Sequence, residues 1–152
     1  MKSYSLISGA GDGLQLGMRS YVRGRPWPAE EVAVLALGPC GAGRPHVFAT
    51  TGLLIPLKLH PRLLELAGRA PRATRHVGPA LPARSRRWPA IAVAGLDELG
   101  RAPHARQASD TPDQVRPAAI DATVDLCLGL ITRLDRDLSP SAETSSAGLT
   151  DR

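Results

Sequence analysis

A glycine-rich turn at residues 9–13 is the first segment of the sequence whose residue types could do chemistry. It follows an apolar run and precedes a helical pattern, which is the setting of a dinucleotide-binding fingerprint. That fingerprint needs a third glycine for close packing of helix on strand, but Leu14 occupies the position, or Leu16 if the pattern starts at Gly11. Asp12 also opposes anions at the turn. We therefore interpret the turn as conformational.

A polar turn and a loop cysteine are the other two candidates. Ser109-Asp110-Thr111 could supply a nucleophile near His104, but Ser, Asp and Thr are also the usual turn formers before a helix. We favour turn formation over catalysis. The Cys40 thiolate would be reactive if Arg44 lowered its pKa, but no catalytic base can be assigned, and we favour an inert thiol.

Length and composition indicate one globular domain in the cytoplasm. The chain has 152 residues, and its 43% apolar content is enough for one core, which must be aliphatic because aromatic residues make up only 3%. Cys40 and Cys127 lack the spacing of a metal or redox motif, as expected for a reduced cytoplasmic protein. No run approaches the ~20 apolar residues of a membrane span. We expect no contact with a membrane.

The net charge of +5 comes almost wholly from arginine. Seven arginines fall between Arg62 and Arg87, and guanidinium groups bind phosphate well. However, only Trp88 is close enough in sequence for base stacking, and no nucleic-acid-binding module is visible. We favour a solvated surface segment over a nucleic-acid site.

Two continuous apolar runs predict strands that helices cover on both faces. They are Val32–Leu37, which we expect at the centre of a parallel sheet, and Pro89–Ala94. Shorter strands are predicted over residues 4–8 and 46–50. Apolar spacing predicts helices over residues 14–22 and 61–70. Residues 71–89 are expected to form a long loop with one weak strand at 75–77, and residues 95–114 to be irregular.

The last helix, which begins near Pro117, is the clearest element. Its apolar residues fall on one stripe, which should face the core: Ile120, Val124, Cys127, Leu128, Ile131, Leu134 and Leu138. Arg133 is placed to pair with Asp137, four residues on. The following tail, residues 139–152, has little to bury and is expected to be disordered, so the folded domain should span residues 1–138.

Taken in order, these segments resemble the C-terminal part of the aminopeptidase-type zinc exopeptidases, metallopeptidase family twenty-eight, over about residues 3–138. The turn at residues 9–13 is similar to the family's Ala-Glu-Glu step after a strand. Arg87-Trp88-Pro89-Ala90 resembles the start of a later strand, and Asp110-Thr111 resembles a step before the closing helix. The resemblance implies an α/β fold: a mainly parallel, mixed sheet with helices on both faces, truncated at its N-terminus.

The resemblance also implies which residues would occupy the family's two-zinc site. Such a site needs carboxylate and imidazole ligands and an unligated base. The general-base position is Gly11, and the adjacent ligand position is Asp12. A second carboxylate position is Gly38, and the imidazole position is Arg106, with His104 a weak substitute two residues away. Only Asp12 matches among these positions.

We therefore expect a degenerate, catalytically inactive member of this fold, without a catalytic residue or a zinc ion. It would have a binding or scaffold role toward a peptide or protein partner. The alternative is a zinc-dependent aminopeptidase-type hydrolase that missing N-terminal elements complete. A basic nucleic-acid-binding protein is the third possibility. The sequence leaves the partner and the oligomeric state open.

Overall fold

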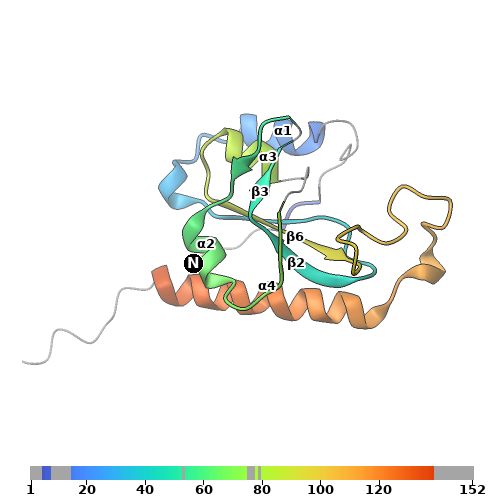
Figure 1. The fold of residues 1–152 in the computed structure, drawn as a ribbon. Helices are drawn as coiled ribbons and strands as arrows, with labels where there is room; N and C mark the ends of the chain where they lie inside the picture. The colour runs from blue at the N-terminus through green and yellow to red at the C-terminus, as the bar shows by residue number, and fades with distance from the viewer. Residues whose placement is uncertain (1–4, 8–14, 53, 75–77, 79, 139–152) are drawn as a thin grey trace, which may run out of the picture.

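A four-stranded mixed sheet with helices on both sides forms the centre of the protein (Figure 1). The computed structural model describes residues 5–7, 15–52, 54–74, 78 and 80–138. The strands are β1 (Val34–Leu37), β2 (Arg44–Phe48), β5 (Arg72–Ala73) and β6 (Ala90–Leu96), in the spatial order β1-β6-β2-β5. β1 is parallel to β6 and β5 is parallel to β2, while β2 is antiparallel to β6. The predicted mixed sheet is confirmed.

Short elements complete the fold around this sheet. The helices are α1 (Leu16–Arg23), α2 (Pro61–Leu66), α3 (Ala80–Ser85) and α4 (Pro117–Leu138), with single 3₁₀ turns η1 (Ala29–Glu31) and η2 (Pro112–Gln114). β3 (Thr50–Thr51) and β4 (Leu57–Lys58) form a separate two-stranded ribbon. The predicted helix over residues 61–70 is therefore confirmed but shorter. The predicted irregular stretch over 95–114 is wrong at residues 95–96, which belong to β6, and at η2.

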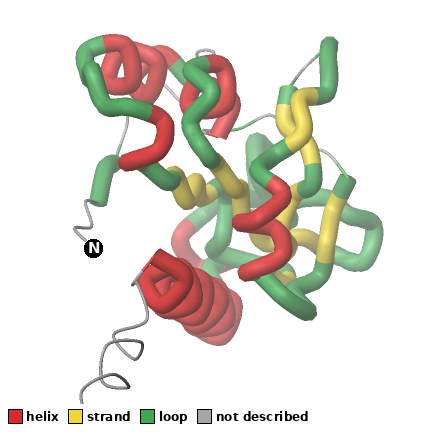
Figure 2. The backbone as a smooth tube through the Cα atoms, turned by 90° about the vertical axis from the view of Figure 1, so that its left-hand side faces the viewer, coloured by secondary structure: helices red, strands yellow, loops and turns green. Residues whose placement is uncertain are grey.

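β6 is one of the two inner strands of the sheet. Its side chains alternate between two layers of the core. Ile91 and Val93 pack with α2 and α4, whereas Ala92 and Ala94 face the opposite layer, which includes residues of α1 and α3. All seven residues of β6 are buried, as predicted for a strand covered on both faces. Figure 2 shows the long helix α4, seen nearly end-on, on one side of the strands and other helices across from it.

The prediction of a loop over residues 71–89 is wrong at residues 80–85, which form the helix α3. Its core-facing residues Ala80 and Ala83 are fully buried, and small side chains of this kind give little apolar periodicity in the sequence. Pro82 lies in the first turn of the helix, where its missing N–H breaks no helical hydrogen bond. The weak strand predicted at residues 75–77 lies outside the described residues, and β5 precedes that segment.

β1 lies at an edge of the described sheet, whereas the sequence predicted a position at its centre. Leu37 in β1 is 51% exposed. A continuous apolar run shows that both faces of a strand pack, but it does not show how many neighbouring strands pair with it. The predicted strand over residues 4–8 is also wrong where it is described, because residues 5–7 are irregular. Its other two residues, like the turn at 9–13, lie outside the described residues.

α4 has the predicted length but presents a different face to the core. Its buried residues are Ala119, Thr123, Cys127 and Leu130. Most of the predicted stripe is exposed instead: Ile120, Val124, Leu128, Ile131 and Leu138. Because α4 is apolar over a wide arc, periodicity shows that it packs but not which part of the arc touches the sheet.

The small side chains of Ala119 and Thr123 explain which side of α4 is buried, since they let the helix lie close to β2. The predicted pair between Arg133 and Asp137 is not formed. Arg133 donates to the Leu66 carbonyl at 2.7 Å, and Asp137 pairs with Arg62 of α2.

Candidate functional site

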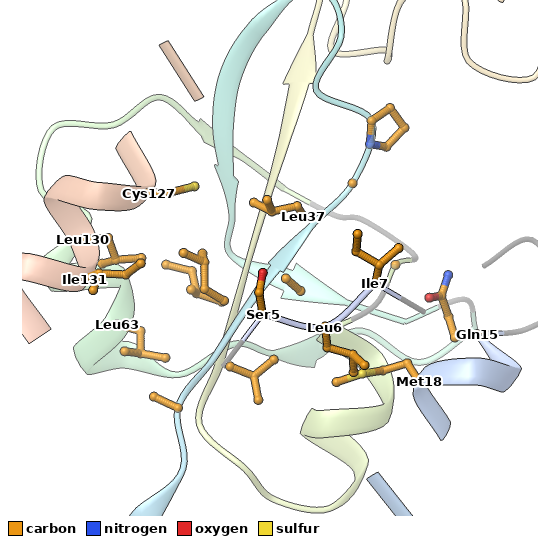
Figure 3. A pocket seen from close by; sticks show the side chains of 18 of the residues that line it. Ser5, Leu6, Ile7, Gln15, Met18, Leu37, Leu63, Cys127, Leu130 and Ile131 are labelled. Carbon is orange, nitrogen blue, oxygen red and sulfur yellow. The ribbon is translucent and has the colours of Figure 1, made fainter. Parts of the chain in front are cut away.

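An open groove of about 1810 Å³ runs along the outer edge of β1. It lies between α1 and residues 5–7 on one side and the C-terminal half of α4 on the other (Figure 3). The loop after β1 and the loop over residues 102–106 form part of its wall. The groove brings together segments from the whole length of the described chain.

The backbone of β1 is open toward this groove. The N–H groups of Val34 and Gly38 donate to carbonyls of Pro89 and Val93 at 2.8 Å, so alternate residues of β1 face β6. By the alternation of a strand, the backbone groups of Leu35 and Leu37 point to the opposite edge. Within the described part of the chain, no strand pairs with that edge. The groove therefore exposes peptide groups that another extended segment could bind.

The walls of the groove are largely apolar. Leu6 is 44% exposed, Ile7 is fully exposed, and Leu37 projects from the strand between them and α4 (Figure 3). Ile131 of α4 also lines the groove, and the exposed stripe of α4 that includes Val124 and Leu128 continues this apolar surface along the helix. A contiguous apolar surface of this kind is typical of an interaction site.

An aromatic cluster lines the end of the groove near α1. The rings of Trp27 and Trp88 stack with centroids 6.0 Å apart, and Tyr21 meets Trp27 edge-on at 6.2 Å. The Arg25 guanidinium lies 4.9 Å from the Tyr21 ring centroid, a cation–π contact. Trp88 donates from Nε1 to the Trp27 carbonyl. The sequence did not indicate this cluster, because its two tryptophans lie far apart in the chain.

Three positions of the predicted zinc site lie on the groove, and two of them have no side chain that can bind zinc. Gly38 directly follows β1 and has no side chain, and Arg106 places a cation where an imidazole ligand is expected. His104 lines the same wall. Gly11 and Asp12 lie outside the described residues. Over the part of the chain that is described, no three His, Cys, Asp or Glu side chains are close enough to hold a metal ion.

His104 instead contacts the polar turn. Its Nδ1 lies 3.1 Å from the Ser109 hydroxyl; His104 is half-buried and Ser109 is exposed. The turn is held by backbone bonds, including Asp110 N–H to the Gln107 carbonyl at 3.0 Å. Hydrogen bonds from Thr111 and then Gln114 lower the pKa of the neighbouring Asp113 carboxyl. These contacts support the interpretation of residues 109–111 as a turn.

Four of the seven clustered arginines bind other parts of the chain. Arg62 pairs with Asp137 and Glu65, and these carboxylates raise the pKa of its guanidinium. Arg72 donates to the Leu64 carbonyl and Arg84 to the Lys58 carbonyl. Arg86 donates to three carbonyls at the end of α1. Their positions are explained by contacts that hold helices and loops together.

No helix in the described part of the chain combines the length and the apolar character needed to cross a bilayer. Comparison with protein-family models, with curated proteins and with solved structures finds no significant match to this chain.

Proposed function

We propose that this chain is a binding protein with a degenerate zinc-exopeptidase-like fold, and that it takes an extended peptide segment of a protein partner along β1. The observation that carries the proposal is the open edge of β1 at the floor of an apolar groove. A sheet edge and an apolar wall together supply the two kinds of contact that strand addition needs.

The main chain of β1 would supply affinity in this binding mode. The outward N–H and C=O groups of Leu35 and Leu37 would pair with the backbone of the bound segment. Its side chains would alternate between the two faces of the sheet. One set would meet Leu37 and Ile131 on the α4 side, and the other would meet Leu6 and Met18. The favoured ligand is therefore a short extended segment rich in apolar side chains.

The charges beside the groove favour one further feature of the ligand. Glu30 and Glu31 lie on η1, a few residues before β1, and both are exposed on the groove. They would attract a basic residue at the end of the segment that lies beside η1. Selectivity would then rest on apolar side chains in the middle of the segment and on a cation at one end.

Catalysis is not the favoured function, because the groove residues at the expected ligand positions lack donor side chains. Gly38 offers only backbone, and Arg106 repels a divalent cation. We accordingly propose that the chain acts without zinc or another cofactor, in the cytoplasm, where Cys40 and Cys127 remain thiols.

A displayed library of random linear peptides, selected on the immobilised protein, tests the binding mode. We expect enriched peptides with apolar residues at alternate positions. Leu37→Lys should weaken their binding by about tenfold or more, because a charge enters the apolar wall. Leu99→Lys is the matched control, since Leu99 is 73% exposed and does not line the groove. Equal losses in both variants, or no enriched peptide, would contradict strand addition.

A second measurement tests the absence of catalysis. Metal content is measured on protein purified with zinc in the medium, together with hydrolysis of an aminoacyl reporter substrate. We expect neither bound zinc near one ion per chain nor hydrolysis above that of a denatured sample. Near-stoichiometric zinc with hydrolysis would instead support the aminopeptidase alternative.

A further inference from the structure

The backbone groups on the open edge of β1 are spaced for antiparallel pairing with an identical strand. Val34 and Gly38 donate their N–H groups to carbonyls in and directly before β6. By the alternation of a strand, Leu35 and Leu37 therefore point their backbone groups away from the sheet. If two copies of β1 run antiparallel about a two-fold axis at Ala36, Leu35 of each copy lies opposite Leu37 of the other. Each edge then satisfies the hydrogen-bonding groups of the other.

The apolar surface beside this edge lies on the α4 side of the sheet. Leu35 packs in the core layer that α4 covers, and Leu37, two residues further on, shares its face. Leu37 and Ile131 line the groove, and Leu128 of α4, 57% exposed, continues the apolar surface along the helix. A two-fold axis perpendicular to the joined sheets keeps both α4 helices on the same side. The apolar surfaces of the two copies therefore meet around the axis and are removed from water.

The charges at the two ends of the groove favour this antiparallel orientation. In the described lining, four carboxylates and one guanidinium lie near the amino end of β1: Glu30, Glu31, Asp135, Asp137 and Arg62. The carboxyl end of the same lining carries Arg106, His104 and Asp110, because the parallel strands β1 and β6 end at the same edge of the sheet. The two-fold axis sets the acidic end of each copy against Arg106 of the other. A parallel arrangement would set the two acidic ends together.

We propose that the extended segment bound along β1 is β1 of a second copy, so that two chains form a symmetrical dimer with one continuous sheet. The inference rests on the strand addition proposed above and names its partner. Arg106 of the second copy supplies the cation expected beside η1, and Leu35 and Leu37 of that copy supply apolar side chains at alternate positions. Because each edge covers the other, association through β1 stops at two copies.

Analytical ultracentrifugation of the full chain over a wide range of protein concentration tests the dimer. We expect a reversible equilibrium between the 16.1 kDa chain and a species of twice that mass. Leu37→Lys should weaken the dimer by about tenfold or more, because it places a charge in the apolar layer at the axis. Leu99→Lys, at an exposed position outside the groove, is the matched control and should leave the dimer unchanged.

Hydrogen exchange in the wild-type chain shows whether the strands themselves pair, and it needs no variant. The amides of Leu35 and Leu37 should exchange more slowly at a protein concentration that favours the dimer than at one that favours the monomer. The Leu99 amide should exchange equally at both. Equal exchange of the β1 amides would overturn the proposal. So would a dimer that Leu128→Lys disrupts and Leu37→Lys does not, since the copies would then meet through α4 alone.

The outcomes also separate this inference from the strand addition on which it rests. A chain that stays monomeric at every concentration overturns the dimer. If that monomer still binds the enriched peptides, strand addition stands and its partner is another protein. If it neither dimerises nor binds peptides, both proposals fail. If the dimer forms as proposed, the enriched peptides should compete with the second copy and lower the fraction of dimer.

Discussion

The guanidinium of Arg62 donates two hydrogen bonds to the carboxylate of Asp137, which lies 75 residues further along the chain. Arg62 is in the first turn of α2, and Asp137 is in the last turn of α4. Arg62 also pairs with Glu65 of its own helix, at 3.1 Å. This ion pair joins the two helices that cover one face of the sheet. It also explains why Asp137 does not pair with Arg133, which donates instead to the end of α2.

We expect Asp137→Asn to lower the melting temperature slightly at neutral pH and not at acid pH. The hydrogen bonds from Arg62 lower the pKa of the Asp137 carboxyl, so its stabilising effect is present above the ordinary pKa of aspartate and is lost as the pH falls through the lowered value. Both groups are exposed, so added salt should also reduce the difference in melting temperature between the wild-type protein and the variant at neutral pH. Thermal scans of both proteins at several pH values measure it.

Asp121→Asn is the matched control for this prediction, because it makes the same substitution at an exposed position of the same helix. A pH-dependent difference that is as large in this control as in Asp137→Asn would show that the Arg62 pair is not its source.

A second prediction concerns the two faces of α4. Leu130 is 3% exposed and packs against Val93 in the layer under the sheet, whereas Leu128 is 57% exposed. Leu130→Ala should lower the free energy of unfolding by about 2–5 kcal/mol, as large-to-small core substitutions do. Leu128→Ala should change it by only about 0.5 kcal/mol or less. Urea unfolding measures both values.

Because the two substitutions are the same and lie two residues apart on one helix, each controls for the other. The stripe that the sequence predicted contains Leu128 and not Leu130. A larger loss in Leu128→Ala than in Leu130→Ala would therefore show that the sequence-predicted face is the buried one.

How far the sequence could predict this fold depended on the kind of signal that each residue gives. β6 was predictable because Ile91 and Val93 stand in a continuous apolar run, and every residue of such a run packs. α3 was not, because Ala80 and Ala83 bury completely without any contrast between apolar and polar positions. The face of α4 depended on small residues such as Thr123, which let it approach β2, and periodicity does not report such long-range fit.

The groove could be predicted only in part. Gly38, His104 and Arg106 were identified from the sequence, and the structure brings them to one groove. The openness of β1 is a property of strand order, which depends on pairing between distant segments and leaves no mark in the residues of Val34–Leu37 themselves. The stacking of Trp27 on Trp88 arises from the same long-range pairing, because Trp88 lies two residues before β6 begins.

A third prediction concerns Gly95 in β6. A Cβ atom at this position would collide with the Ala42 carbonyl oxygen of the loop after β1. Gly95→Ala should force the loop away from β6 and lower the free energy of unfolding by about 1–3 kcal/mol or more. It should also increase the accessibility of Cys40, whose loop is held by the Gly95 N–H. Urea unfolding and the rate of thiol modification measure the two effects.

Gly24→Ala is the comparison for this substitution. The φ angle of Gly24 is −78°, and the nearest atom to an added Cβ lies at an ordinary 3.6 Å, so we expect a change within about 0.5 kcal/mol. If both alanine variants are equally stable, the loop does not lie as close to β6 as described.

The last prediction concerns the pH dependence of the two thiols. Burial raises the pKa of Cys40 and of Cys127, so both stay protonated in the folded protein at pH values where an unfolded thiol already ionises. Unfolding then releases protons, and the free energy of unfolding should fall as the pH rises above the ordinary thiol pKa. Alkylation by iodoacetamide should be slower in the folded protein than in urea at the same pH, and Cys40 should react before the more buried Cys127.

The double variant Cys40→Ser with Cys127→Ser should lose the thiol-dependent part of the fall in stability, because no thiol remains to ionise. If the wild-type chain and the double variant lose stability equally with rising pH, the thiols are not the source of that dependence.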